Sequence, residues 1–369
     1  AAYVNRAFAR SAIAAREMGT RDVRDAFRAA LEDLDRANRL SPGSLETAND
    51  LGVTWFRLAE EEAQHGGDAL EAALKAVGVL DTALAGNPGN PDLLLNRGLA
   101  YLILAQARSA RQEDPRADLD SSIAGFRAHL AVSASVDSEV RYRFALAHFL
   151  RGQAEADAGG DPRAAWSTAF AEAEAVTKQD DHHARAWALL ADLHRQRADL
   201  EEAVSACRRF TRLQPGSPGL QAVLGYLADL DGRSRKDGLA GWRLLAWLSR
   251  ESMTQGEFPR ARVLAEDAIA SAPPDSELDD LTRETLRRLY FDLGRVHARL
   301  SEPVGKRHAA PFDIGDEARA RHRDEAFSML RRAIELGWSE AWELDANADL
   351  EPLRSDPRWN GLVDSLPRK

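Results

Sequence analysis

Three histidines near the middle of the chain are the first candidates for metal chemistry. His182 and His183 adjoin Asp180 and Asp181, and His194 follows twelve positions after His182. Two ligands on one helical face need a spacing of three or four residues, and a structural zinc ion takes about four ligands in all. A zinc site here would therefore require Asp180 or Asp181 as well, and we expect no bound metal.

The tripeptide His322-Arg323-Asp324 has the composition of the catalytic loop of protein kinases. That loop continues with Leu and a later Asn, and it works together with a Gly-rich loop and an Asp-Phe-Gly sequence. Here the chain continues Glu-Ala-Phe-Ser in a helical pattern, and it has no Gly-rich loop, Asp-Phe-Gly, Walker-type loop or Gly-x-Ser-x-Gly elbow. We therefore expect a non-catalytic chain without a cofactor.

The elements that carry these residues recur with a period of 46 or 47 residues. One marker position recurs at Arg6, Gly52, Gly98, Ala145 and Ala191. A second marker recurs in phase with it at Ala30, Ala76, Ser122, Ala169 and Ala203. A third marker recurs at Pro42, Pro88, Ala134, Asp181 and Pro215. Self-similarity at a fixed period of roughly 20 to 50 residues is typical of a solenoid.

Each unit has the pattern of two amphipathic helices, most clearly in 184–217. The first helix of that unit carries one stripe of four residues, namely Trp187, Leu190, Ala191 and His194. The second helix carries the facing stripe and a closing proline, namely Ala203, Cys207, Phe210 and Pro215. At these residues the chain resembles the tetratricopeptide repeat (TPR) family, although His194 and Cys207 depart from its pattern.

The earlier units are longer by about a dozen residues. Their two small positions are 24 apart, against 12 in the last unit, so the two helices together gain roughly three turns. Turn residues mark the middle of each unit: Gly19–Thr20, Gly66–Gly67, Asp114–Pro115 and Gly159–Gly160–Asp161–Pro162. In segments such as residues 154–165, these longer units are similar to the lengthened TPR units that follow the catalytic domain of some bacterial serine/threonine kinases.

The pattern loosens after residue 217. Residues 231–238 are rich in Gly, Ser and charge, and they predict an exposed loop or a subdomain boundary. Helices are expected at about 239–254, 259–271, 276–300 and 316–336, with a loop at 301–315 that contains Pro303, Gly305, Pro311 and Gly315. The last stretch carries four residues that can cover the open end of a solenoid, namely Leu350, Leu353, Trp359 and Leu362. Ligand binding by the tryptophans of this stretch is the alternative.

The composition indicates a folded, acidic protein. Of its 369 residues, 44% are hydrophobic and 29% charged, and the net charge is −10. Nucleic acids and anionic membranes attract concentrated positive charge, so we expect neither as the main partner. No apolar run approaches the ~20 residues of a membrane-spanning helix. Because the chain opens at Ala1 within its first repeat, we expect a piece of a longer, cytoplasmic polypeptide.

The concave surface is the remaining functional candidate. In TPR arrays the first helix of each unit lines the groove, so the polar and aromatic residues of those helices are candidates for peptide binding: Asn49, Asn96, Arg97, Arg141, Tyr142 and Arg143. Some TPR domains grip a peptide carboxylate with a Lys/Asn set, but its lysines are missing here. The arginines suit an acidic or phosphorylated peptide. Plain solvated helix faces are the alternative for each residue.

These observations predict an all-α fold, a TPR-like right-handed α-solenoid of antiparallel helix pairs with a C-terminal cap. The array covers 1–217, in units of about 1–44, 45–90, 91–136, 137–183 and 184–217. An irregular helical segment at 218–315 and a last helix with the cap at 316–369 follow.

The function expected is a non-catalytic protein–protein interaction scaffold. The kinase resemblance implies the regulatory or recruiting region of a larger bacterial signalling protein, with a peptide or protein on the concave face. Two alternatives remain: an accessory region of an enzyme whose catalytic domain lies elsewhere, or a structural module that self-associates.

Overall fold

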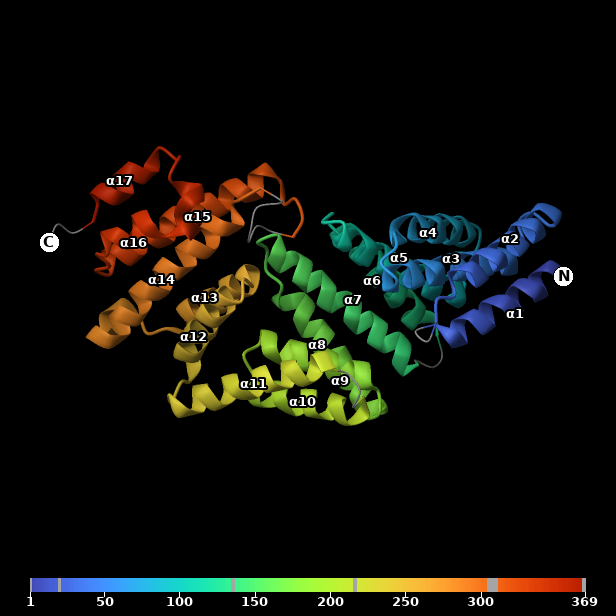
Figure 1. Cartoon of the computed structure of the whole chain (residues 1–369), viewed down its shortest axis with the longest axis horizontal. Helices are drawn as coiled ribbons and strands as arrows, with labels where there is room; N and C mark the ends of the chain where they lie inside the picture. Colours follow the sequence, from blue (N-terminus) through green and yellow to red (C-terminus); the bar gives the residue numbers. More distant parts are fainter. Residues whose placement is uncertain (1, 19–20, 134–136, 215–217, 304–310, 367–369) are drawn as a thin grey trace. The chain divides into compact units, whose positions relative to one another are not determined.

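The computed structural model describes residues 2–18, 21–133, 137–214, 218–303 and 311–366 (Figure 1). Every regular element in these ranges is a helix, which confirms the all-α prediction. Five of the residues marked in the sequence lie outside the described ranges, namely Gly19, Thr20, Ala134, Pro215 and Gly305. The chain forms two compact units: unit 1 comprises 1–154 and 164–186, and unit 2 comprises 155–163 and 187–369.

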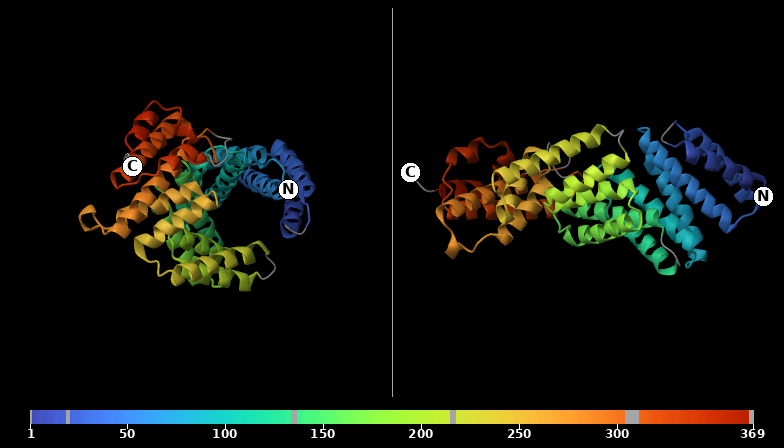
Figure 2. Two further views of the ribbon diagram at one scale, coloured as in Figure 1. Left: turned by 60° about the vertical axis from the view of Figure 1, so that its left-hand side comes forward. Right: turned by 90° about the horizontal axis from the view of Figure 1, so that it is seen from below.

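Unit 1 is a stack of antiparallel helix pairs (Figure 2). Its elements are α1 (Ala2–Glu17), α2 (Arg24–Leu40), α3 (Leu45–Gln64), α4 (Ala69–Gly86), α5 (Pro91–Ala110), α6 (Arg116–Val132) and most of α7 (Ser138–Asp157) and α8 (Arg163–Gln179). The first helix of a pair contacts its own second helix, and α3 also contacts α5, the first helix of the next pair. Among the described residues, no helix is both long and apolar enough to cross a membrane.

Local sequence sets where these helices begin and end. The side chains of Ser44, Asp68 and Asn90 accept backbone N–H groups in the first turns of α3, α4 and α5, and Pro91 opens α5. Between α3 and α4, Gly66 has φ +70°, a conformation that suits glycine. The turns predicted at 66–67, 114–115 and 159–162 are all confirmed.

The small residues of the repeat lie where paired helices approach most closely. The second marker set is fully buried, namely Ala30, Ala76, Ser122, Ala169 and Ala203. The approach is closest between α5 and α6, where a Cβ added to Gly125 would lie 2.9 Å from Cα of Gly98. At the same crossing, the Ser122 hydroxyl donates to the Gly98 carbonyl at 2.8 Å, so its polar atom is satisfied in the core.

Unit 2 continues with helices and ends in a cap. Its elements are the remainder of α9 (Ala184–Gln196), then α10 (Leu200–Leu213), α11 (Pro218–Lys236), α12 (Gly241–Thr254), α13 (Phe258–Ser271), η1 (Asp275–Glu277), α14 (Asp280–Leu300), α15 (Gly315–Glu335), α16 (Ala341–Ala346), η2 (Ala348–Leu353) and α17 (Arg358–Asp364). Consecutive helices pack pairwise, α10 with α11, α12 with α13, and α14 with α15. Cys207 is buried on α10, as its place in the apolar stripe predicted.

The loop predicted at 231–238 is wrong, because α11 runs through Lys236. Arg235 pairs with Asp231 one turn earlier, and Arg233 approaches Asp229 in the same way. Such i, i+4 ion pairs support a helix even where glycine and serine disfavour one. Only the last part of the stretch is a turn, and Gly238 has φ +62° there.

The cap prediction is confirmed by the core of unit 2. Leu350, Leu353, Trp359 and Leu362 are buried in one cluster with residues of α14 and α15. Trp338 belongs to the same cluster and stacks on Phe291 with ring centroids 4.2 Å apart. Trp342, in contrast, is 64% exposed.

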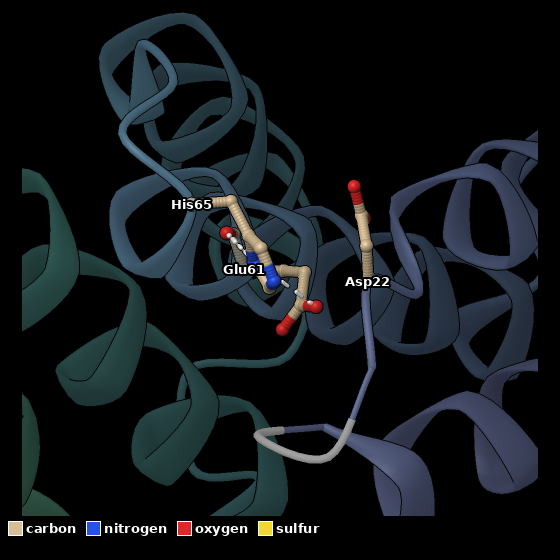
Figure 3. A group of neighbouring side chains, drawn as sticks. All are labelled: Asp22, Glu61 and His65. Atoms are coloured by element: carbon tan, nitrogen blue, oxygen red, sulfur yellow. Dashed lines mark hydrogen bonds and ion pairs between the residues drawn. The ribbon is translucent and has the colours of Figure 1, made fainter.

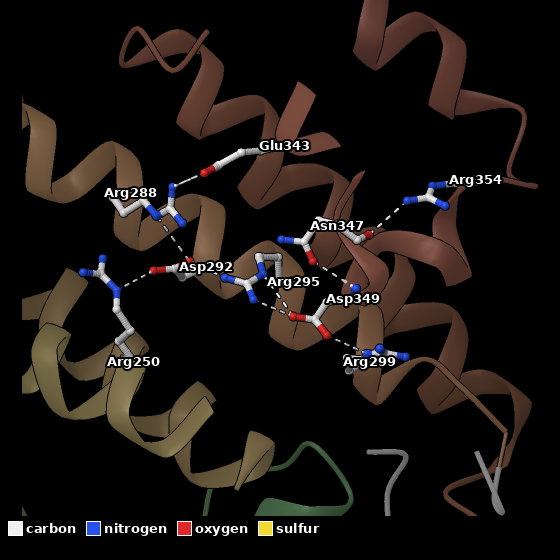
Figure 4. Close-up of polar contacts among 9 residues, drawn as sticks. All are labelled: Arg250, Arg288, Asp292, Arg295, Arg299, Glu343, Asn347, Asp349 and Arg354. Atoms are coloured by element: carbon white, nitrogen blue, oxygen red, sulfur yellow. Dashed lines mark hydrogen bonds and ion pairs between the residues drawn. The ribbon is translucent and has the colours of Figure 1, made fainter. Parts of the chain in front are cut away.

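A network of arginines and carboxylates ties the cap to α12 and α14 (Figure 4). Asp292 is almost fully buried and accepts from Arg250 at 3.1 Å and Arg295 at 2.9 Å. Asp349 in η2 accepts from Arg295 at 2.6 Å and from Arg299 at 2.9 Å. The buried Asp292 and the half-buried Asp349 therefore each have at least two cationic partners, which compensates the cost of removing their charge from water.

We predict that Gly125→Ala destabilises unit 1. The new Cβ would press on the Gly98 backbone, which cannot turn away as a side chain can, so we expect a loss of about 1 kcal/mol or more. Gly78→Ala on α4 is the matched control, because its Cβ would meet nothing within 4 Å. The control should gain about 0.5–1 kcal/mol through helix propensity. Urea unfolding of both variants tests this, and equal shifts would contradict it.

Loss of the buried hub should destabilise unit 2. Asp292→Ala leaves three arginines without their shared carboxylate, and we expect a loss of about 3 kcal/mol. Asp280→Ala, at a fully exposed position on the same helix, should change stability by less than about 0.5 kcal/mol. Thermal unfolding followed by circular dichroism distinguishes the two. An Asp292→Ala transition at the control's temperature would show that the network contributes nothing to stability.

Candidate functional site

A hollow with polar and apolar lining lies on the first helices of unit 1. It has a volume of about 610 Å³ and is lined by the C-terminal halves of α3 and α5, the turn between α3 and α4, and Arg143 of α7. The apolar part of its wall is made of alanines and Ile103, whereas Glu60, Gln64, Gln106 and Arg111 supply polar groups. A second hollow of about 520 Å³, near the ends of α2 and α4, has no charged side chain in its lining.

Glu60 and Arg143 form the charged end of the first hollow. The Arg143 guanidinium lies 3.6 Å from the Glu60 carboxylate, and this contact joins first helices two repeats apart. Burial raises the pKa of Glu60, and Arg143, Arg57 and Arg185 offset the rise only in part. The wall of the hollow therefore holds a carboxylate that is poorly solvated and incompletely neutralised.

Glu139 explains why Arg143 neutralises Glu60 incompletely. The Nε–H group of Arg143 donates to Glu139 at 2.8 Å, a closer contact than the one to Glu60. Glu139 also accepts from Arg185 at 2.8 Å and lies 3.2 Å from Nε2 of His183. Since Nδ1 of His183 accepts the N–H of Ala186 in the first turn of α9, its other nitrogen is the one that donates to Glu139.

The remaining sequence-predicted residues lie outside the lining of the hollow. Asn96 donates to the Asn49 side chain at 2.8 Å, which links α5 to α3. Arg97 donates to Asp81 on α4 at 2.6 Å, and Arg141 donates to Glu172 on α8 at 2.9 Å. Tyr142 is buried beside His183, with ring centroids 5.0 Å apart. Of the six candidates, Arg143 alone lines the hollow in the described structure.

The sequence reasoning missed Glu60 and Gln106, although the repeat contains the signal for them. The two residues are 46 positions apart, and each follows the small residue of its first helix by eight positions, Gly52 and Gly98 respectively. Eight positions are about two further helical turns, within the part by which these units are lengthened. Extending the register along the longer helices would have marked both residues as facing the hollow.

One cluster of potential metal ligands lies where the start of α2 meets the end of α3 (Figure 3). Atoms of Asp22, Glu61 and His65 lie within 4.8 Å of one another, and Glu61 and His65 are one turn apart on α3. Glu61 is fully buried and accepts the backbone N–H of Val23 at 3.1 Å. Arg24 contacts both oxygens of Asp22 and lowers the pKa of that carboxyl well below its usual range. These contacts fasten the start of α2 to α3.

The three histidines considered first have different partners in the structure. His182 gathers with Asp180 and Asp181 on an exposed turn, the combination that a zinc site here would require. His183 instead caps α9 and faces Glu139, and His194 lies beside Asp199. Exposed acidic groups such as this turn are common without a metal.

The tripeptide 322–324 lies inside α15, as its sequence context predicted. His322 is buried, and Asp324 pairs with Arg358 of the cap at 2.6 Å. A helix in this position does not form the loop that presents a catalytic aspartate to a substrate hydroxyl.

Comparison with known proteins gives a likeness in fold. No protein-family model and no curated protein matches the chain. A thermophilic TPR protein from Thermus thermophilus is 16% identical, with a TM-score of 0.41 over 60% of this chain and 98% of that one. A TPR protein from Parabacteroides merdae is 13% identical, with a TM-score of 0.35 over 94% of this chain and 98% of that one.

A third solved structure, of YrrB, is described as a TPR protein with an unusual peptide-binding site. It is 16% identical, with a TM-score of 0.38 over 60% of this chain and 89% of that one. Similarities at this level identify no partner for the present chain.

We predict that Glu60→Gln raises the stability of unit 1 at neutral pH. The folded chain raises the pKa of Glu60, so its charged form costs stability at neutral pH. That cost fades as the pH falls toward 4.5, the ordinary value for glutamate, since the carboxyl is then protonated in the folded chain as well. Urea midpoints at neutral and acidic pH measure the difference. A variant that is less stable than the wild type at pH 7 would contradict this account.

Proposed function

We propose that unit 1 is a non-catalytic interaction module whose hollow binds an extended peptide segment of a partner protein. The observation that carries the proposal is the under-neutralised carboxylate of Glu60 in the wall of a 610 Å³ hollow. A lysine or arginine of the bound segment would supply the missing charge. In a partly desolvated site this contact is stronger than the same ion pair in water.

The other lining residues suit a peptide backbone. Gln64 and Gln106 each offer a carbonyl acceptor and an NH₂ donor, the complement of the N–H and C=O groups of an extended chain. Alanines and glycines between them let a backbone approach closely. A helical ligand would instead need a continuous apolar groove, which this lining does not offer.

Arg143 sets the charge selectivity of the hollow in this proposal. It is shared between Glu139 and Glu60, so an acidic or phosphorylated segment would have to displace one of these carboxylates. Arg97 and Arg141 are likewise paired with carboxylates on second helices. The asparagine pair Asn49–Asn96 lies on the same first helices and is a proposed extension of the peptide path.

The resemblance in the lengthened repeats extends the proposal to a biological setting. We place the chain as the regulatory or recruiting region of a larger bacterial signalling protein, of the kind linked to serine/threonine kinases, in the cytoplasm. The tested claim is the chemistry of the hollow, which does not depend on that setting.

Selection from a phage-displayed library of random short peptides on the whole chain tests the proposal. We expect enriched peptides to share a lysine or arginine, and the best of them to bind at least about tenfold more weakly to Glu60→Gln, a loss of 1.4 kcal/mol. Glu32→Gln, at an exposed position on α2, is the matched control and should bind like the wild type.

Three results would overturn the proposal. Enrichment of acidic peptides whose binding survives Glu60→Gln but fails in Arg143→Gln would replace it with an anion-selective groove. An equal loss of peptide affinity in Glu60→Gln and Glu32→Gln would show that the hollow is not the binding site. Absence of any enriched peptide would show that unit 1 does not bind short segments.

A further inference from the structure

Unit 2 contains a cavity that the proposed function does not use. Its volume is about 290 Å³, and it lies among α13, α14, α15 and the turn at 158–159. Leucine, methionine and alanine side chains form part of its wall, and six titratable residues complete it: Arg262, Glu266, His297, Arg321, His322 and Glu325. A small cavity with a few convergent polar groups is the usual form of a small-ligand site.

A pair of buried histidines forms one side of the cavity. Nδ1 of His297 lies 2.9 Å from Nδ1 of His322, and both side chains are buried. One ring must donate and the other accept in this contact. The donor ring therefore keeps a lone pair on Nε2, and the acceptor ring keeps an N–H there.

The backbone of Gly159 packs against the Nε2 edge of His322. A Cβ at this position would lie 2.2 Å from Nε2 of His322, so any larger residue would press on the imidazole. Its φ of +79° is also a conformation that favours glycine. The turn thus approaches the ring without covering it with a side chain.

Arg262 supplies a buried positive charge with an unused donor. Its side chain is 5% exposed and donates to Glu266 at 2.7 Å and to the Gly160 carbonyl at 2.6 Å. Its Nε–H is buried and has no hydrogen-bond partner. An unpaired buried donor is costly, so the bonds to Glu266 and Gly160 leave this guanidinium incompletely satisfied.

The charges are arranged by depth. The buried groups are Arg262, His297 and His322, which are cationic or can become so. The acidic groups are more open to solvent, since Glu266 is 33% exposed and Glu325 is exposed. Arg321 adds a further cation at the rim and has no ion-pair partner among the described residues. The buried end therefore holds the groups that are or can become cationic, and the carboxylates lie nearer to solvent.

We propose that this cavity binds a small oxyanion, a phosphate, sulfate or carboxylate group, held at its inner end by Arg262 and the His297–His322 pair. A cavity of about 290 Å³ has room for a small oxyanion, or for the anionic group of a small metabolite.

Binding should take up a proton from solution. Burial lowers the pKa of His322 to about 4 and that of His297 well below its ordinary value, with Arg262 and, for His322, Arg321 adding to the effect. Both rings are thus neutral at pH 7. A bound anion favours protonation of the free Nε2, and the Nδ1 hydrogen bond survives because the donor ring keeps its Nδ1–H. The facing carboxylates, Glu266 and Glu325, favour the same change.

Calorimetric titration of the whole chain with sodium sulfate tests this site, since sulfate does not itself titrate near neutral pH. We expect saturable binding that tightens as the pH falls, and buffers of different ionisation enthalpy should show up to one proton taken up. Potassium phosphate and sodium malonate as further ligands separate the phosphate and carboxylate sources. The imidazole resonances of His297 and His322 should shift on titration.

Two variants locate the binding. Ala318→Leu fills the cavity and changes no charge, and Arg262→Gln removes the buried cation. Each should weaken sulfate binding at least about tenfold. Arg283→Gln, at an exposed position on α14, is the control and should bind normally.

If Arg262→Gln does not fold, Ala318→Leu and the histidine resonances still decide the question. Absence of binding, unchanged affinity in Ala318→Leu, or unshifted His297 and His322 resonances would overturn the proposal. Binding without proton uptake would overturn the role assigned to the histidine pair. None of these outcomes bears on the peptide proposal for unit 1.

Discussion

The close approach of paired helix backbones is the constraint on which the repeat stack depends. Between α5 and α6 that approach leaves no room for a Cβ at Gly125, and other pairs hold buried alanines at the positions equivalent to Ser122, namely Ala30, Ala76, Ala169 and Ala203. Small residues at these points let the helices interlock at a fixed rotation. The rotation in turn decides which residues of α3, α5 and α7 face the hollow.

In the lengthened helices, the residues that pack the helix pair and the residues proposed to bind a peptide lie at different positions along the helix. The small residues stay at the crossing, whereas Glu60 and Gln106 lie two turns further along, where the first helices line the hollow. Burial of Glu60 raises its pKa, so the chain carries a cost in stability that a partner's cation would relieve. Residues retained against their effect on stability are typical of binding surfaces.

Both candidate sites contain a poorly solvated charged group that is incompletely compensated, an anion in unit 1 and a cation in unit 2. In unit 1 a carboxylate is held in a partly desolvated wall with an arginine that it shares with Glu139, and in unit 2 a buried guanidinium retains an unpaired N–H beside neutral imidazoles. Each arrangement leaves a buried polar group incompletely compensated. The first therefore favours a cationic side chain and the second a small oxyanion.

The sequence predicted what depends on periodicity and local turn chemistry. The helix pairs, the buried set from Ala30 to Ala203 and the capping leucines all follow from spacing alone. The prediction of a loop at 231–238 was wrong. Glycine and serine in this stretch favour a loop, but ion pairs within α11 keep most of it helical. The His297–His322 contact joins residues 25 apart on two helices, and no local pattern identifies it.

For the candidate peptide-binding residues too, spacing predicts the helix on which a residue lies but not the tertiary contacts of its side chain. Arg143 could be placed on a first helix from its register, but its sharing between Glu139 and Glu60 depends on how α7 and α3 meet. Desolvation of Glu60 is likewise a property of the assembled stack. Spacing thus identified helices that line the hollow and could not identify which side chains were left without a full partner.

Hydrogen exchange of the whole chain with and without a library-selected peptide tests the central claim most directly. The account predicts new protection at the C-terminal halves of α3 and α5, around residues 60–69 and 103–111, and at the start of α7. Protection confined to the second helices α2, α4 and α6, or to unit 2, would contradict the assignment of the hollow as the binding site.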